Sequence, residues 1–355
     1  MATETRTPRA GEALDEAALG AWLRDALPDA AGEPVIRQFP GGASNLTYLI
    51  TVGERDYVLR RPPFGTKAAS AHDMEREYRI LSALRPVYPY CPQPLAWCGD
   101  EDVLGEPFYL MERLSGKILR RELPPDLTLP PAAATALCRN LVDVHLELHR
   151  VDFEAAGLAS FGKPAGYVGR QVHGWSKRYR AARTDDVPDN EALMEWLAAH
   201  MPPDDPSPAV IHNDYKFDNV VLDDEDGALR IVGVLDWEMA TLGDPLMDLG
   251  CSLAYWIEAD DPPPLQLARM MPTQLPGMMT RRELVDYYLE QAGRSGVSFD
   301  FYYAFGLFRL AVIVQQIYFR YVHGQTADER FANFGQLCSL MSHRAVAVAR
   351  GEASI

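Results

Sequence analysis

The chain has 355 residues, 47% of them hydrophobic, and a formal net charge of -16. That length can bury a large core and can form two lobes. The acidic balance argues against nucleic acids and anionic membrane surfaces as partners, because both attract basic patches.

Cysteine usage and hydropathy predict the compartment. The five cysteines are an odd number and form no C-x-x-C pair, so we expect reduced thiols in the cytoplasm, without disulfides or zinc. The N-terminus lacks a basic end followed by an apolar core, and no run approaches eighteen apolar residues. These features predict neither secretion nor a membrane span.

The first third of the chain has mainly strand character. Residues 1–32 give a polar tail and one short helix that ends at a proline. VIRQF, LTYLITV and YVLR then predict three strands, joined by the turns PGGASN and GERD. AASAHDMEREYRILSAL has helical spacing, and two more strands flank the turn GDEDVLG. The pattern predicts a small lobe with a five-stranded antiparallel sheet and one helix.

Beyond Gly116 the sequence becomes mainly helical. Leu137, Leu141, Val144 and Leu148 share one helical face and should lie in the core. His145 and His149 on the same helix have the spacing of a zinc pair, for which a core or surface pair is the alternative. The next helix carries a basic cluster, which could meet an anionic substrate or form a solvated face: Arg170, Lys177, Arg178 and Arg180.

The C-terminal part reads as an irregular segment followed by three helices. Residues 259–279 are rich in proline and methionine, a composition that adapts to apolar ligands. Four polar residues interrupt the apolar helix near residue 310, and some of them must face a partner or a groove: Arg309, Gln315, Gln316 and Arg320.

The segment 211–250 carries the chemistry. His212, Asp214, Lys216 and Asn219 reproduce the H-x-D-x-K-x-x-N order of a kinase catalytic loop. Phosphoryl transfer needs a carboxylate that orients the attacking hydroxyl, and Asp214 suits that task. Asn219 and Asp236 offer the hard oxygen ligands that Mg²⁺ prefers, and Lys216 could offset charge on the transferring phosphoryl group.

Two apolar strands separate the expected metal ligands. VVLDDEDGALRIVGVLD reads as a hairpin with its turn at Asp226-Gly227. Folding it would bring Asn219, at its entrance, beside Asp236, at its exit. Each of these residues alone is an ordinary loop residue, so it is their combination that indicates a phosphoryl-transfer site.

These motifs resemble the aminoglycoside phosphotransferase and choline kinase-like superfamily, with its H-G-D-x-x-x-x-N and I-D-W/F-E motifs. The phrase VLDWEMATLGDPLMDLG is most similar to the kinase-like domain associated with acyl-CoA dehydrogenases. Asn213 departs from the glycine usual in the motif, although asparagine tolerates left-handed backbone conformations.

The resemblance implies an α+β, two-lobed protein-kinase-like fold whose large, mainly helical lobe carries the catalytic hairpin. The boundaries it implies are a tail and helix over 1–32, a nucleotide-covering lobe over 33–111, a hinge over 112–116 and a catalytic and substrate-binding lobe over 117–355. It also implies ATP, with GTP as the alternative, and Mg²⁺ as cofactors.

The resemblance assigns nucleotide-binding residues to the small lobe. Its phosphate-covering loop implies Gly42, Ser44 and Asn45, where glycines allow close backbone approach. Arg60 stands where kinases place a lysine, and arginine can grip phosphate bidentately. Glu77 is its expected partner, with Glu75 as the competing choice.

Two further assignments concern backbone contacts and loop support. In the hinge, backbone groups near Met111 and Arg113 would bind adenine. Asp248 would accept hydrogen bonds from the catalytic-loop backbone, and Asp244 would cap the following helix.

The resulting prediction is an enzyme that phosphorylates an alcohol group of a small molecule. The segment after Asp236 lacks an A-P-E ending, which argues against a protein substrate. We expect a hydroxyacyl compound or its CoA thioester, together with functional association with an acyl-CoA dehydrogenase. The alternatives are an aminoglycoside-type antibiotic kinase and an inactive kinase-like binding or scaffold protein.

Overall fold

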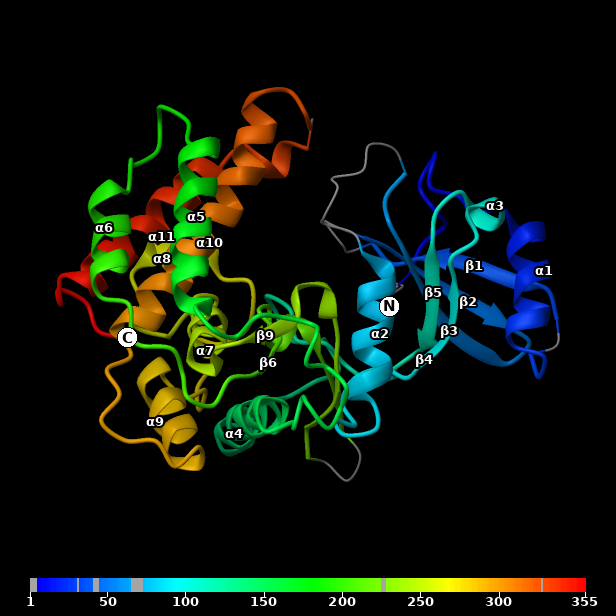
Figure 1. The fold of residues 1–355 in the computed structure, drawn as a ribbon, viewed down its shortest axis with the longest axis horizontal. Helices are drawn as coiled ribbons and strands as arrows, with labels where there is room; N and C mark the ends of the chain where they lie inside the picture. Colours follow the sequence, from blue (N-terminus) through cyan, green and yellow to red (C-terminus); the bar gives the residue numbers. More distant parts are fainter. Residues whose placement is uncertain (1–4, 31, 41–44, 65–72, 225–227, 327) are drawn as a thin grey trace. The chain divides into compact units, whose positions relative to one another are not determined.

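A computed structural model describes residues 5–30, 32–40, 45–64, 73–224, 228–326 and 328–355 (Figure 1). The chain divides into two compact units. The first comprises residues 1–115 together with 233–238, and the second comprises 116–232 and 239–355. Among the described residues, no helix is long and apolar enough to cross a membrane.

The first unit contains one five-stranded antiparallel sheet, as the sequence predicted. The second and third strands form a hairpin in which Leu46 lies opposite Arg61. Gly53 lies in the two-residue turn between them, and its φ of 61° suits such a turn. In spatial order the strands are β1 (Pro34–Gln38), β2 (Leu46–Val52), β3 (Arg55–Arg61), β5 (Phe108–Glu112) and β4 (Pro94–Cys98).

Helices cover both faces of this sheet (Figure 1). Helix α1 (Glu16–Ala26) buries Leu19 and Leu23 in a core cluster that includes Leu59. Arg60, the next residue of the strand, points to the other face, where α2 (Met74–Leu84) lies. The alternation along β3 therefore places Leu59 on the face covered by α1 and Arg60 on the face covered by α2.

The predicted turn GDEDVLG contains a short helix instead. GDEDVLG forms the short helix α3 (Glu101–Leu104), because the side chain of Asp100 accepts a hydrogen bond from the Asp102 N–H at the helix start. Gly105 ends the helix with a φ of 80°.

The second unit is mainly helical, again as predicted. Its helices are α4 (Pro131–His149), α5 (Tyr167–Ala182), α6 (Glu191–Ala199), α7 (Pro245–Leu253), α8 (Pro263–Ala268), α9 (Arg281–Gln291), α10 (Asp300–Val322) and α11 (Phe334–Ala349). The basic cluster predicted on α5 is exposed, in agreement with a solvated face.

Two small sheets frame the predicted catalytic segment. Strand β6 (Ala209–Ile211) pairs with β9 (Thr241–Gly243), and β7 (Val220–Asp223) pairs with β8 (Arg230–Val234). The hairpin turn predicted at Asp226-Gly227 lies outside the described residues. The architecture confirms the predicted α+β fold with an antiparallel small lobe and a helical large lobe.

Helices α7 and α10 touch at a pair of glycines. A Cβ on Gly306 would lie 2.1 Å from the carbonyl oxygen of Gly250, and a Cβ on Gly250 would lie 2.3 Å from that of Tyr302. Only residues without a side chain allow this approach. The contact fixes where the following turn of α10 meets α7.

Candidate active site

The segment between β6 and β7 forms a tight loop that Asp248 holds from below. The carboxylate of Asp248, on α7, accepts the backbone N–H groups of His212 (2.7 Å) and Asn213 (2.6 Å). Asn213 has a φ of 64°, the left-handed conformation that glycine would take in its place. Asp244 caps α7 by accepting the N–H groups of Leu246 and Met247.

Two histidines complete the surroundings of Asp248. His145 and His149 on α4 place their Nε2 atoms 2.9 and 3.1 Å from its Oδ2. The Nδ1 of His149 lies 2.7 Å from the hydroxyl of Tyr288. The Nε2–H of His149 therefore donates to Asp248, and its Nδ1 accepts from the tyrosine.

This arrangement lowers the pKa of His149 and the pKa of Asp248. Burial, followed by the charge of His145, lowers the pKa of His149 to about 4. Burial alone would raise the pKa of Asp248, but its interactions with His145 and His149 keep that pKa well below its usual range. The pair predicted from sequence as zinc-like or structural thus forms a buried hydrogen-bond network beneath the loop.

Asp214 lies at the tip of the loop. Its Oδ2 accepts hydrogen bonds from Lys216 Nζ and from Asn219 Nδ2, the second at 2.8 Å. Its backbone N–H donates to His212 Nδ1 at 3.2 Å. The side chain is 21% exposed, whereas that of Lys216 is 7% exposed. The loop therefore presents a fixed carboxylate that a ligand can reach.

Asn219 has an amide oxygen suited to a cation. Its Nδ2 donates to both the carbonyl and the carboxylate of Asp214, two atoms that can only accept. That contact fixes the amide orientation, and among the described residues no hydrogen-bond donor meets its Oδ1. A carbonyl oxygen beside a carboxylate is a donor set that fits Mg²⁺.

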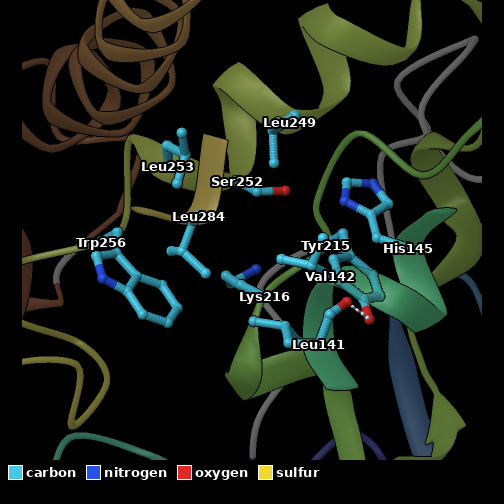
Figure 2. Close-up of a pocket in the computed structure, with 10 residues that line it drawn as sticks. All are labelled: Leu141, Val142, His145, Tyr215, Lys216, Leu249, Ser252, Leu253, Trp256 and Leu284. Carbon is cyan, nitrogen blue, oxygen red and sulfur yellow. Dashed lines mark hydrogen bonds between the residues drawn. The ribbon is translucent and has the colours of Figure 1, made fainter. Parts of the chain in front are cut away.

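Beneath the loop lies a small apolar cavity (Figure 2). Its volume is about 20 Å³, room for little more than one water molecule. The aliphatic chain of Lys216 and the ring of Tyr215 contribute to its lining, and the Tyr215 hydroxyl donates to the carbonyl of Leu141 on α4 at 2.8 Å. The side chains that line this cavity anchor the loop, and the cavity is too small for a substrate.

The first unit holds a second charged cluster, centred on Arg60. Its guanidinium pairs with Glu77 (3.0 Å) and Asp236 (3.0 Å) and lies 3.7 Å from Glu238. Glu75, the competing choice for its partner, is exposed. Burial opposes the charge on Arg60, but Glu77 and Asp236 raise its pKa well above the usual range, so the arginine is a permanent cation at this position.

Asp236 has an unusual backbone. Its φ of 66° is uncommon for a residue with a side chain. The carboxylate is 37% exposed and receives Arg60 Nη2 at 3.0 Å. A strained conformation that exposes a carboxylate beside a buried arginine is typical of functional positions.

The remaining predicted nucleotide residues also belong to the first unit. Asn45 is buried and donates to Glu238 at 2.8 Å, whereas Gly42 and Ser44 lie outside the described residues. Met111 is buried in β5, and Arg113 pairs with Asp56. Asn219 belongs to the second unit and Asp236 to the first.

The structure adds three residues to those predicted as site residues. Glu238 contacts both Arg60 and Asn45. In the second unit, Tyr255 lies beside Lys216, whose Nζ is 4.9 Å from the tyrosine ring centroid. Burial opposes the charge on Arg309, but its interactions with Cys251, Tyr255 and Asp214 raise its pKa above the usual range. The W-E pair after Asp236 and the arginine within an apolar helix were the available sequence signals.

Comparison with known proteins shows the family. Residues 35–278 match the model of the phosphotransferase enzyme family. The mouse protein acyl-CoA dehydrogenase family member 10 is 36% identical over 96% of this chain, and human family member 11 is 34% identical over 91%. The chain spans only 32% and 42% of the lengths of these two relatives.

Solved structures share the fold. A crystal structure from Ralstonia eutropha JMP134, provisionally named an aminoglycoside phosphotransferase, is 32% identical with a TM-score of 0.80 and covers 96% of this chain and 99% of its own. The ternary complex of a thermostable mutant of the aminoglycoside phosphotransferase APH(4)-Ia with AMP-PNP and hygromycin B has a TM-score of 0.58 at 15% identity, over 95% of this chain and 99% of its own. Because the family model and these relatives match most of its length, the chain belongs to the phosphotransferase enzyme family.

Proposed function

We propose that the chain is a kinase that transfers a phosphoryl group from ATP, with GTP as the alternative donor, to a hydroxyl group of a small molecule. The observation that carries this proposal is Asp214, a reachable carboxylate held by Lys216 and Asn219 on a loop braced by Asp248. Such a carboxylate can orient an attacking hydroxyl and accept its proton. Lys216 would offset charge on the transferring group, and His212 would hold the loop in shape.

Mg²⁺ would be held by Asn219 and Asp236, whose oxygens suit a hard cation. When bound, the ion neutralises charge on the nucleotide phosphates. Arg60 would contact the phosphates with Glu77 fixing its position, and Gly42, Ser44 and Asn45 would cover them. Backbone groups near Met111 and Arg113 would receive the base.

For the acceptor we propose a hydroxyacyl compound or its CoA thioester. The supporting observation is the identity of 34 to 36% with proteins named acyl-CoA dehydrogenase family members over nearly the whole of this chain. A functional association with an acyl-CoA dehydrogenase follows from the same relationship. The five buried, unpaired cysteines fit a reducing compartment such as the cytoplasm.

An aminoglycoside acceptor is the second candidate. The 32% identical structure from Ralstonia eutropha carries that provisional name, and the net charge of -16 would attract a cationic antibiotic. Both candidates use the same catalytic loop, so only the acceptor distinguishes them.

The test is an acceptor screen that measures ADP or GDP release in the presence of magnesium. Turnover of hydroxyacyl compounds supports the first candidate, and turnover of aminoglycosides alone supports the second. Nucleotide binding without a phosphorylated product across both classes would instead indicate a kinase-like binding protein.

Two variants test the division of roles. Asp214→Asn should remove most turnover, roughly a hundredfold or more, and leave nucleotide affinity nearly intact. Asp236→Asn should weaken binding of the magnesium nucleotide. Equal loss of affinity in both variants would contradict the proposed roles.

A further inference from the structure

Arg309 is a buried cation without an oxygen partner. It lies on α10 and is 3% exposed. Its Nη2 contacts the Sδ of Met239 at 3.3 Å, and its guanidinium carbon lies 5.2 Å from the ring centroid of Trp175. Among the described residues, no carboxylate oxygen lies within 4.0 Å of its nitrogens and no oxygen accepts a hydrogen bond from them.

The other buried arginines in the described part of the chain all pair with oxygen atoms. Arg281, 2% exposed, donates to both oxygens of Asp261 at 2.6 and 3.0 Å and to the carbonyl of Trp256 at 2.9 Å. Arg60 pairs with Glu77, and Arg61 donates to two backbone carbonyls. The guanidinium of Arg309 has lost its hydration on burial, and its contacts with a sulfur atom and an aromatic ring are weaker than hydrogen bonds to oxygen. This pattern differs from that of a structural arginine.

The fold brings Arg309 to the catalytic loop. The glycine contact between Gly306 and Gly250 sets the position of the helical turn that carries Arg309. Met239, the sulfur partner of Arg309, receives a hydrogen bond on its carbonyl from Asn213 Nδ2 at 3.1 Å. Asn213 directly precedes Asp214, so the guanidinium lies one residue contact away from the proposed base.

We infer that Arg309 is a specificity-determining residue that binds an anionic oxygen of the acceptor, such as a carboxylate, while Asp214 orients the hydroxyl. This inference rests on the proposed function and narrows its acceptor class. The planar guanidinium matches a carboxylate with two parallel hydrogen bonds. The positive charge of Arg309 disfavours a cationic group at that end of the acceptor.

The test uses acceptors that differ only at one end. A matched trio is 3-hydroxybutyrate, 1,3-butanediol and 4-amino-2-butanol, which share a secondary hydroxyl and end in a carboxylate, an alcohol or an ammonium group. Corresponding trios of three to six carbons vary the distance between the hydroxyl and the charge. The 3-hydroxybutyryl-CoA thioester shows whether a carbonyl oxygen or a CoA phosphate replaces the carboxylate.

Binding is measured by thermal shift without nucleotide, and turnover by phosphorylated product with magnesium and ATP. The wild-type protein should favour the acid over the diol and the amine in at least one trio. Arg309→Gln should reduce kcat/KM for the acid about ten- to a hundredfold and leave the diol nearly unchanged. Arg309→Lys keeps the charge without the fork and should give an intermediate preference.

The matched control is Arg178→Gln. Arg178 also lies over the ring of Trp175, at 4.6 Å, but is exposed, so its loss should leave the acid-to-diol ratio unchanged. Circular dichroism checks that each variant is folded. If Arg309→Gln does not fold, the ratio in Arg309→Lys decides.

Two results would overturn the inference. One is a wild-type protein that binds no acid better than its diol in any trio. The other is an equal loss for acid, diol and amine on substitution, which would indicate a structural role or contact with the transferring phosphoryl group. Absence of turnover with retained, Arg309-dependent binding of the acid would contradict the proposed kinase activity and support the binding role.

Discussion

Asn213 has a φ of 64° in the loop that carries Asp214. Its amide satisfies two neighbours at once, since Nδ2 donates to the carbonyl of Met239 at 3.1 Å and Oδ1 accepts from the hydroxyl of Tyr167 at 3.2 Å. Glycine would take the same conformation at no steric cost but would lose both bonds. Asparagine is less favourable than glycine in this backbone conformation, but its two side-chain hydrogen bonds hold the loop in place.

We expect the order of stability at this position to be asparagine, glycine, alanine. Asn213→Gly loses the two hydrogen bonds, whereas Asn213→Ala also meets the left-handed penalty and should cost about 1 kcal/mol more in the free energy of unfolding. Urea unfolding of the three proteins measures this difference. An alanine variant as stable as the glycine variant would show that the backbone torsion is not under constraint.

Among individual site residues, the sequence could predict the grouping only of those that are close together in the chain. The spacing of His212, Asp214, Lys216 and Asn219 is local, and so their grouping could be predicted. Glu238 with Asn45 and Arg309 with Met239 are separated by 193 and 70 residues. Such pairs depend on how distant elements pack, which no local spacing reveals.

At the scale of elements, helical spacing predicted the long helices, and runs of β-branched and aromatic residues between turn sequences predicted the five strands of the sheet. Helix α3 and the strands β6 and β9 are too short for a pattern: β6 and β9 have three residues each. Their existence depends on capping and on pairing with a distant partner. The glycine crossing of α7 and α10 was equally invisible, because each glycine alone only weakens a helix.

Gly306→Ala should separate these two helices. The added Cβ would lie 2.1 Å from the carbonyl oxygen of Gly250, and overpacking of this kind costs about 1–3 kcal/mol. Gly174 on α5 is the control, since a Cβ there meets only Arg178 Nη1 at 3.8 Å, and Gly174→Ala should be neutral or stabilise by up to about 1 kcal/mol. Thermal and urea unfolding report both; similar effects in the two variants would contradict the close crossing.

At the scale of the whole molecule, acid should destabilise the protein through His149. In the unfolded chain His149 titrates near 6.5, and in the folded protein its pKa is about 4. Between these values the unfolded state binds more protons, so stability is full above pH 6.5 and falls as the pH drops toward 4. The loss from this group is roughly 3 kcal/mol at most.

His149→Gln isolates this contribution, because the amide can still donate to Asp248 but does not titrate. We expect the free energy of unfolding of the variant to depend less on pH between 6.5 and 4 than that of the wild-type protein. Below pH 4 both proteins should lose stability as Asp248, whose folded pKa is depressed, becomes protonated. Parallel curves between pH 4 and 6.5 would show that His149 is not buried in its neutral form.

The two compact units each contribute one proposed magnesium ligand, Asn219 from the second and Asp236 from the first. If both hold the same ion, their effects on binding of the magnesium nucleotide cannot be independent. Asn219→Ala and Asp236→Ala should each weaken that binding, and the double variant should be weaker by less than the product of the two, with a coupling energy of about 0.5–3 kcal/mol. Isothermal titration with MgATP measures the cycle, and ATP in EDTA is the control in which both single variants should match the wild-type protein. Strictly additive losses would mean that the two residues act on separate parts of the nucleotide or on none, and the shared magnesium site would then have to be abandoned while the Asp214 loop kept its proposed role.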